Sequence, residues 1–75
     1  MNEKLFKTIL KRYEAAIEDA AYKIDIICEQ TLVIPEHIDI TGEIDKLLQI
    51  IAENEDKVAA MRKYYDEKKA ETAIL

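Results

Sequence analysis

Apolar side chains in the first part of the chain recur at alternating steps of four and three residues, from Phe6 to Ile27. This is the spacing of the a and d positions of a helical heptad, and it is sustained over about three heptads. Further small or apolar residues widen this stripe on its flanks, namely Ile9, Ala16, Ala21 and Cys28. A wide stripe is typical of a bundle helix, so the pattern predicts a helix over about 3–30 with Asn2 as its N-cap.

The same steps return in the second part of the chain. Thr41 stands just before them as the candidate N-cap. Lys68 and Lys69 fall near the end of the pattern, where the helix dipole favours positive charge. A second helix is therefore expected over about 42–69, followed by a tail over 70–75.

The a and d positions of both segments are the predicted seam, which serves as the hairpin core and as a dimer contact. Its members are Phe6, Leu10, Tyr13, Ile17, Ala20, Ile24, Ile27, Ile44, Leu47, Ile51, Asn54, Val58, Met61 and Tyr65. Leu48 and Ile50 flank the second stripe near its start. Asn54 is polar, and a buried polar seam residue fixes register and oligomeric state at some cost in stability. The alternative is a surface Asn on a slightly rotated helix.

The connection, at about 31–41, contains Pro35, which prevents one continuous helix. It is unusual for a loop because several of its residues are aliphatic, namely Leu32, Val33, Ile34, Ile38 and Ile40. It is either a cap over the open end of a bundle or an apolar patch for a partner. The predicted fold class is all-α: a two-helix antiparallel hairpin in a single domain over 1–75.

Folding the chain about residue 36 sets Tyr13 near Ala59 and Ala60, and sets Ala20 near Asn54. One hairpin covers only one side of each wide stripe, whereas two hairpins close a core as a four-helix bundle. The lone cysteine excludes an intrachain disulfide. We therefore expect a partner chain to stabilise this short domain. The layout is similar to that of the Rop family of plasmid regulators, which are antiparallel dimers of helical hairpins. That resemblance is architectural, and no residue role is carried over.

Charge is unevenly divided along the chain. Residues 1–13 carry a net +3 and residues 59–75 a net +1, whereas residues 14–58 carry a net −9. A hairpin brings the two basic segments together at the end away from the connection. An antiparallel homodimer then places each basic end against the acidic part of its partner, although screening limits such effects to about 8–10 Å. Within the helices, Asp19–Lys23 and Glu53–Lys57 are expected as ion pairs between residues four apart.

The sequence offers little for catalysis. Glu14 with Glu18, and Asp25 with Glu29, are carboxylate pairs at helical spacing and are read as a solvated face; the alternative is a metal site shared between chains. No acid precedes His37 by three residues, so the Glu-x-x-His pair of di-metal bundles is missing. The single His37 is read as a structural residue, with a pH sensor as the alternative. Cys28 is read as a small buried hydrophobe. We predict no enzymatic activity and no cofactor.

Cationic and tyrosine side chains gather towards the two termini. Those that form a possible anion-binding site are Lys4, Lys7, Lys11, Arg12, Arg62, Lys63, Tyr64, Lys68 and Lys69. Cations beside aromatic rings hold phosphates and stack bases, but charge complementation within a dimer explains the same residues.

The functional prediction follows from these surfaces. We expect a non-enzymatic, self-associating protein that binds another macromolecule as an inhibitor, adaptor or small regulatory subunit. The alternative is a nucleotide or nucleic-acid binder. No stretch approaches the roughly 20 apolar residues of a membrane helix, so no membrane partner is expected and the expected location is the cytoplasm.

Overall fold

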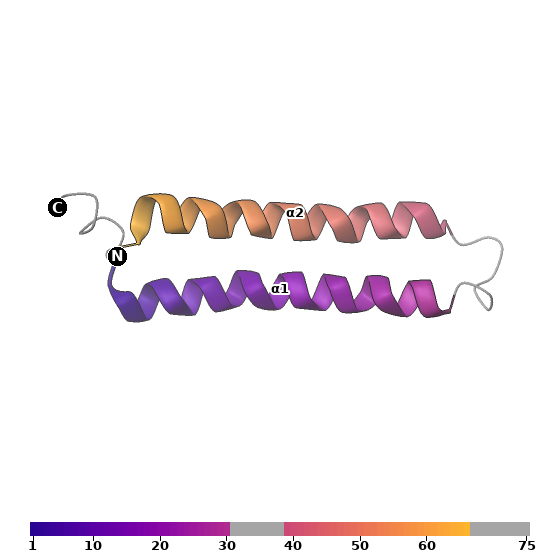
Figure 1. The fold of residues 1–75 in the computed structure, drawn as a ribbon, viewed down its shortest axis with the longest axis horizontal. Helices are drawn as coiled ribbons and strands as arrows, with labels where there is room; N and C mark the ends of the chain where they lie inside the picture. Colours follow the sequence, from indigo (N-terminus) through magenta and orange to yellow (C-terminus); the bar gives the residue numbers. More distant parts are fainter. Residues whose placement is uncertain (31–38, 67–75) are drawn as a thin grey trace.

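The chain forms two long helices that run antiparallel, side by side (Figure 1). The computed structural model describes residues 1–30 and 39–66. Helix α1 spans Glu3–Glu29 with 27 residues, and α2 spans Ile40–Tyr65 with 26, so each is about 40 Å long at 1.5 Å per residue. Within the described residues the fold is all-α, and the predicted pairing of two helices is confirmed.

The start of α1 follows the predicted capping. Asn2 has an extended backbone, and its side-chain oxygen accepts a hydrogen bond from the Leu5 amide at 2.8 Å. This satisfies one of the backbone donors that a helix leaves open in its first turn. At the other end, the Gln30 amide donates to the carbonyl oxygens of Ile26 and Ile27, which closes the last turn.

The start of α2 differs from the prediction, because Asp39 rather than Thr41 is the N-cap. The Asp39 carboxylate accepts a hydrogen bond from the Gly42 amide at 3.0 Å. Thr41 already lies inside the helix, and its hydroxyl donates to the same carboxylate at 3.2 Å. The helix therefore begins two residues before the expected position 42, at Ile40. A carboxylate also interacts favourably with the positive end of the helix dipole, which a hydroxyl does not.

The end of α2 also differs from the prediction. The helix ends at Tyr65, and Asp66 is extended with ψ of 105°, so the expected continuation to about 69 is wrong at Asp66. In Figure 1 this end of α2 lies beside the first turn of α1. Tyr65 therefore stands opposite the beginning of its packing partner, and packing supplies much of a helix's stability. The predicted positions 67–69, the tail, Pro35 and His37 lie outside the described residues.

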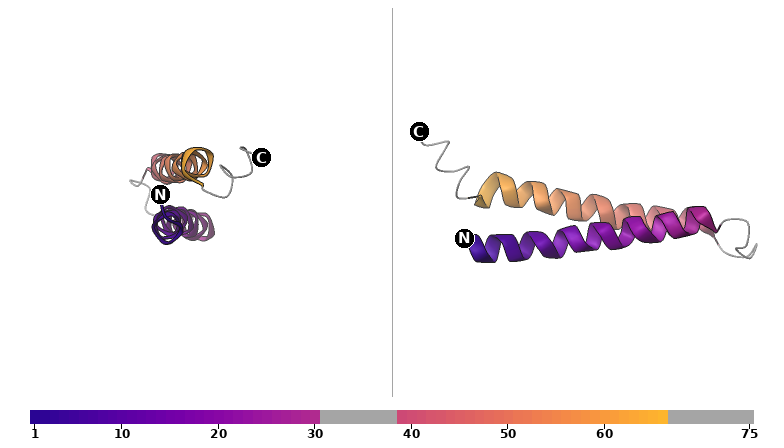
Figure 2. Two further views of the ribbon diagram at one scale, coloured as in Figure 1. Left: turned by 90° about the vertical axis from the view of Figure 1, so that its left-hand side faces the viewer. Right: turned by 60° about the horizontal axis from the view of Figure 1, so that its bottom comes forward.

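The two helices pack only against each other. Figure 2 shows no other described element beside this pair. Only Leu10, Ala20 and Met61 fall in the buried class among the described residues, with 8%, 1% and 8% of their surface exposed. The other members of the seam, Tyr65 apart, are partly buried. A core this thin leaves apolar area at the edges of the seam in contact with water.

Candidate interaction surfaces

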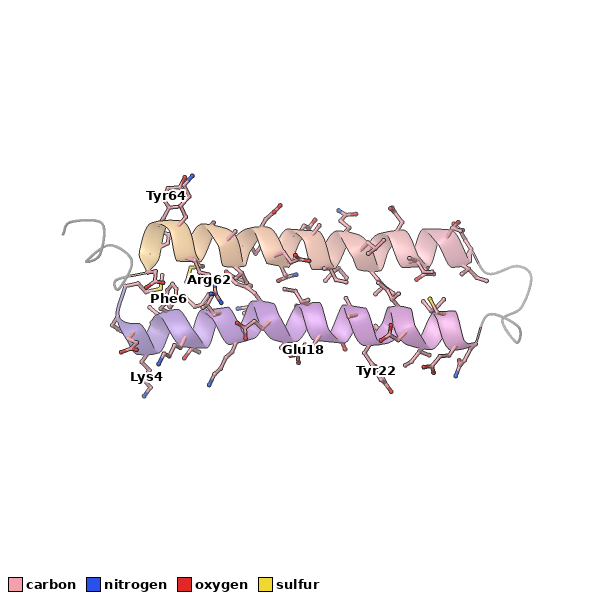
Figure 3. All side chains as sticks on the ribbon, viewed as in Figure 1. Lys4, Phe6, Glu18, Tyr22, Arg62 and Tyr64 are labelled. Atoms are coloured by element: carbon pink, nitrogen blue, oxygen red, sulfur yellow. The ribbon has the colours of Figure 1, made fainter. Side chains whose placement is uncertain are left out.

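Two contacts between α1 and α2 distinguish the two flanks of the seam. On one flank, Arg62 Nη2 lies 4.0 Å from Glu14 Oε1, and Figure 3 shows Arg62 between the helices. On the other flank, Lys57 Nζ lies 5.5 Å from the centre of the Tyr13 ring. Helix positions seven residues apart share a face, and so do those three or four apart. The two contacts therefore assign neighbouring residues to one flank or the other.

The flank of the Lys57–Tyr13 contact is the more apolar one. Ile50 precedes Lys57 by seven residues, and Ile9 precedes Tyr13 by four. Leu5, four residues before Ile9, lies on the same side near the start of α1. Ile26, two steps of seven and one of three after Ile9, lies on it near the end of α1. We call this flank the apolar face and define it by Leu5, Ile9, Ile26 and Ile50.

The apolar face is open to solvent in the hairpin. Leu5 is 47% exposed and Ile50 is 40% exposed, while Ile9 and Ile26 are partly buried. These residues come from both ends of the hairpin rather than from one spot. Apolar side chains exposed singly are common on protein surfaces, so it is their alignment along one flank of a thin seam that makes this face a candidate for contact with another chain.

Most charged residues along the apolar face have partners within their own hairpin, whereas Arg12 takes part in no ion pair among the described residues. Lys23 Nζ lies 2.9 Å from Asp19 Oδ2, which confirms the predicted pair. Lys46 Nζ lies 3.4 Å from Glu43 Oε1. Lys57 lies over the Tyr13 ring. The face therefore carries charges that are largely compensated locally.

The predicted Glu53–Lys57 pair is wrong within the described residues. Glu53 Oε1 instead accepts a hydrogen bond from Gln49 Nε2 at 3.1 Å, and Lys57 lies over Tyr13. A cation in contact with an aromatic face gains an attraction comparable to that of a surface ion pair. This tertiary contact was missed because the pairing rule considers one helix at a time.

The flank of the Arg62–Glu14 contact has a different character. We call it the charged face. Its charged residues are Lys4, Lys7, Lys11, Glu14 and Arg62 towards the termini, Glu18 and Glu55 near the middle, and Asp25 and Asp45 towards the connection. Basic residues thus dominate one half and acidic residues occupy the other. Leu48, at 52% exposed, is the large aliphatic residue on this face.

The predicted seam residues lie between these two faces, and Phe6 points from α1 into the gap between the helices (Figure 3). Tyr65 is the exception, at 52% exposed, because it stands in the last turn of α2. Asn54 is partly buried, and its Nδ2 donates to the Ile50 carbonyl oxygen at 2.7 Å. The amide of Asn54 therefore has a partner within its own helix.

The possible anion-binding residues do not converge on one point. Lys7 pairs with Glu3 at 3.1 Å, and Lys63 lies over the neighbouring Tyr64 ring at 5.2 Å. Tyr64 itself extends away from α1 in Figure 3. By helical spacing, Arg12 falls on the apolar side of α1, away from Lys4 and Lys11. Lys68 and Lys69 lie outside the described residues.

Groups suited to catalysis or metal binding are sparse in the described part of the chain. No cluster of three or more His, Cys, Asp or Glu side chains there could hold a metal ion. Glu14 has Arg62 as its neighbour. Cys28 is exposed, so its predicted burial is wrong: it lies on the charged-face flank of α1, beside the seam rather than in it. The described residues contain no buried side-chain polar atom without a hydrogen-bond partner, so the hairpin interior holds no unpaired group aimed at a ligand.

The fold and these surfaces define the class of protein as a small all-helical hairpin with two contrasting open faces. Among the described residues, neither helix has the length and apolar character needed to span a membrane. Comparisons of the chain with family models, with characterised proteins and with solved structures found no match.

Proposed function

We propose that this hairpin is a non-enzymatic binding protein that self-associates as an antiparallel four-helix bundle dimer. In this state it binds another macromolecule in the cytoplasm, as an inhibitor, adaptor or small regulatory subunit. The observation that carries the proposal is the thin seam, where Leu10, Ala20 and Met61 alone among the described residues are buried.

A hairpin with so small a core gains from any chain that covers its open side. Fully burying one large aliphatic side chain contributes about 1.5–3 kcal/mol. Leu5 and Ile50 are roughly half exposed in the hairpin, so each has much of this energy still to gain. Small domains that lack disulfides and metals commonly obtain such burial by oligomerisation.

Light scattering behind a sizing column tests the self-association directly. We expect a dimer with full helicity at tens of micromolar. A monodisperse, fully helical monomer at that concentration contradicts the proposal. Affinity capture from the native host, followed by mass spectrometry, then identifies the macromolecular partner.

The second candidate, a nucleotide or nucleic-acid binder, is favoured by one arrangement. Lys4 and Lys11 lie seven residues apart on the charged face, and no ion pair within the described residues involves either one. Phosphate binding by these groups would weaken steeply with rising salt. Titration of labelled oligonucleotides at several salt concentrations distinguishes this function from the first one.

A further inference from the structure

We infer that a second copy of this chain docks on the apolar face, turned end for end, and that the charged face stays in solvent. The inference rests on the proposed self-association and names the surface that performs it. The occupant is identified by how the apolar residues and the charges of this hairpin are distributed.

The apolar face is complementary to itself. Leu5 and Ile9 lie towards the termini, while Ile26 and Ile50 lie towards the connection. A copy turned end for end sets Leu5 of each hairpin near Ile26 of the other, and sets Ile50, which lies close to the middle of α2, near its own counterpart. A two-fold interface of this kind uses the same patch on both chains, so one face is sufficient for both.

Charges favour the same face for burial. Asp19, Lys23, Glu43 and Lys46 lie along the apolar face and are paired within their own helices, so a docked copy leaves no unpaired charge from these residues at the interface. On the charged face, a docked copy would desolvate more cations and carboxylates. Burying ion pairs gains little or costs stability, whereas burying aliphatic surface is favourable. A second copy is therefore expected to bury the apolar face rather than the charged face.

Orientation follows from the uneven charge along the hairpin. Residues 1–13 carry a net +3, and residues 14–58 carry a net −9. An end-for-end copy brings the basic end of each hairpin to the acidic part of the other. A copy in the same direction stacks the basic ends together and is disfavoured.

Leu48 and Ile50 provide a matched pair for the test. They are two residues apart in α2, have similar exposure at 52% and 40%, and lie on opposite faces. We would replace each with Gln, which adds no charge, and measure the dimer dissociation constant by sedimentation velocity. Ile50→Gln should raise this constant about a hundredfold, whereas Leu48→Gln should change it less than about threefold. Leu5→Gln repeats the test at the far end of the same face if Ile50→Gln loses helicity.

Each outcome distinguishes the inference from the proposal beneath it. A dimeric wild type that is dissociated by Ile50→Gln or Leu5→Gln, but not by Leu48→Gln, supports the inference. A dimeric wild type that is dissociated by Leu48→Gln alone overturns the inference and leaves self-association intact. A wild type that stays monomeric overturns both.

Discussion

Lys57 of α2 holds its ammonium group 5.5 Å from the centre of the Tyr13 ring of α1, which makes it a contact between helices rather than within one. Its acidic neighbour Glu53 bonds to Gln49 instead. The residue numbers of the Lys57–Tyr13 contact add up to 70 and those of the Arg62–Glu14 contact to 76, so together the two contacts agree with the predicted placement of Tyr13 near Ala59 and Ala60. Lys57 therefore contributes to the tertiary fold.

The first prediction concerns the energy of this contact. A double-mutant cycle of Tyr13→Leu and Lys57→Met, followed by urea denaturation, should give a coupling free energy of about 0.5–1 kcal/mol. Lys63 and Tyr64 provide the control, because their contact at 5.2 Å lies within one helix. Their cycle should give a smaller coupling. A coupling free energy indistinguishable from zero in the Lys57–Tyr13 cycle would show that this contact does not link the helices energetically.

The second prediction concerns the cap of α2. Asp39→Ala should lower the free energy of unfolding by about 1 kcal/mol, because the Gly42 amide loses its acceptor. Thr41→Ala should cost less, since its hydroxyl only supports the Asp39 carboxylate. Thermal denaturation of both variants under identical conditions makes the comparison. A larger loss for Thr41→Ala would restore Thr41 as the cap.

Gly42 provides an independent check of the same cap. A Cβ at this position would collide with the Asp39 carboxylate, so Gly42→Ala must displace the capping group. The loss of about 1 kcal/mol from the cap then offsets the gain of about 0.5–1 kcal/mol that Ala normally gives over Gly in a helix. We expect an unfolding midpoint close to that of the wild type. In an Asp39→Ala background the same substitution should be clearly stabilising.

These two helix ends show what the sequence could and could not determine. Asn2 was predicted because it is the one good capping residue before the first stripe. Asp39 and Thr41 are both good caps, and the local sequence does not decide between them. No Gly or Pro follows Tyr65 to mark the end of α2. That end coincides with the start of α1 across the gap, which is a tertiary relationship.

The candidate surfaces were predictable to a similar extent. The a and d spacing located the seam. It describes only the central stripe of each helix, so it does not tell the two flanks of that stripe apart. Leu5 and Ile26 were therefore missed as members of an open face. Sorting the flanking positions of α1 into rows seven residues apart would have put both in one row, next to the row of Ile9. The contacts of Lys57 and Arg62 then show which row of α1 lies beside which row of α2.

The third prediction concerns Asn54. Burying an unpaired amide costs about 1–3 kcal/mol, but the Asn54 side chain already donates to the Ile50 carbonyl oxygen at 2.7 Å. Asn54→Leu should therefore raise the stability by less than that amount while weakening the preference for a single oligomeric state. Thermal denaturation and light scattering measure the two effects. An unchanged melting temperature together with an unchanged oligomer would mean that Asn54 is merely a surface residue.

The fourth prediction concerns orientation in the proposed dimer. A spin label at Lys4→Cys, in a Cys28→Ser background, reports the distance between the two terminal ends. If the dimer is centred near residue 16 of α1, two labels twelve residues from that centre lie about 36 Å apart along the axis at 1.5 Å per residue. In a parallel dimer the labels share one end and lie much closer. Pulsed electron resonance distinguishes these arrangements, and a single short distance would rule out the antiparallel one.

The final prediction separates assembly from ligand binding at the basic end. Both explanations use Lys4, Lys7, Lys11 and Arg12, which we would replace together with Gln. If these charges serve assembly, the dimer should weaken by only about 1–2 kcal/mol, because exposed ion pairs contribute about 0–1 kcal/mol each. The wild type should then show negligible affinity for a short single-stranded nucleic acid or a cyclic dinucleotide at physiological salt. We expect this outcome, because Lys7 already pairs with Glu3 and Arg12 falls on a different side of α1 from the lysines.

If the charges serve a ligand, the wild type should bind it with an affinity that falls steeply as salt rises, and the variant should lose binding while remaining dimeric. Micromolar binding at physiological salt that Tyr64→Ala abolishes would make the second candidate the leading function, because it would show that the exposed ring at this end takes part in recognition.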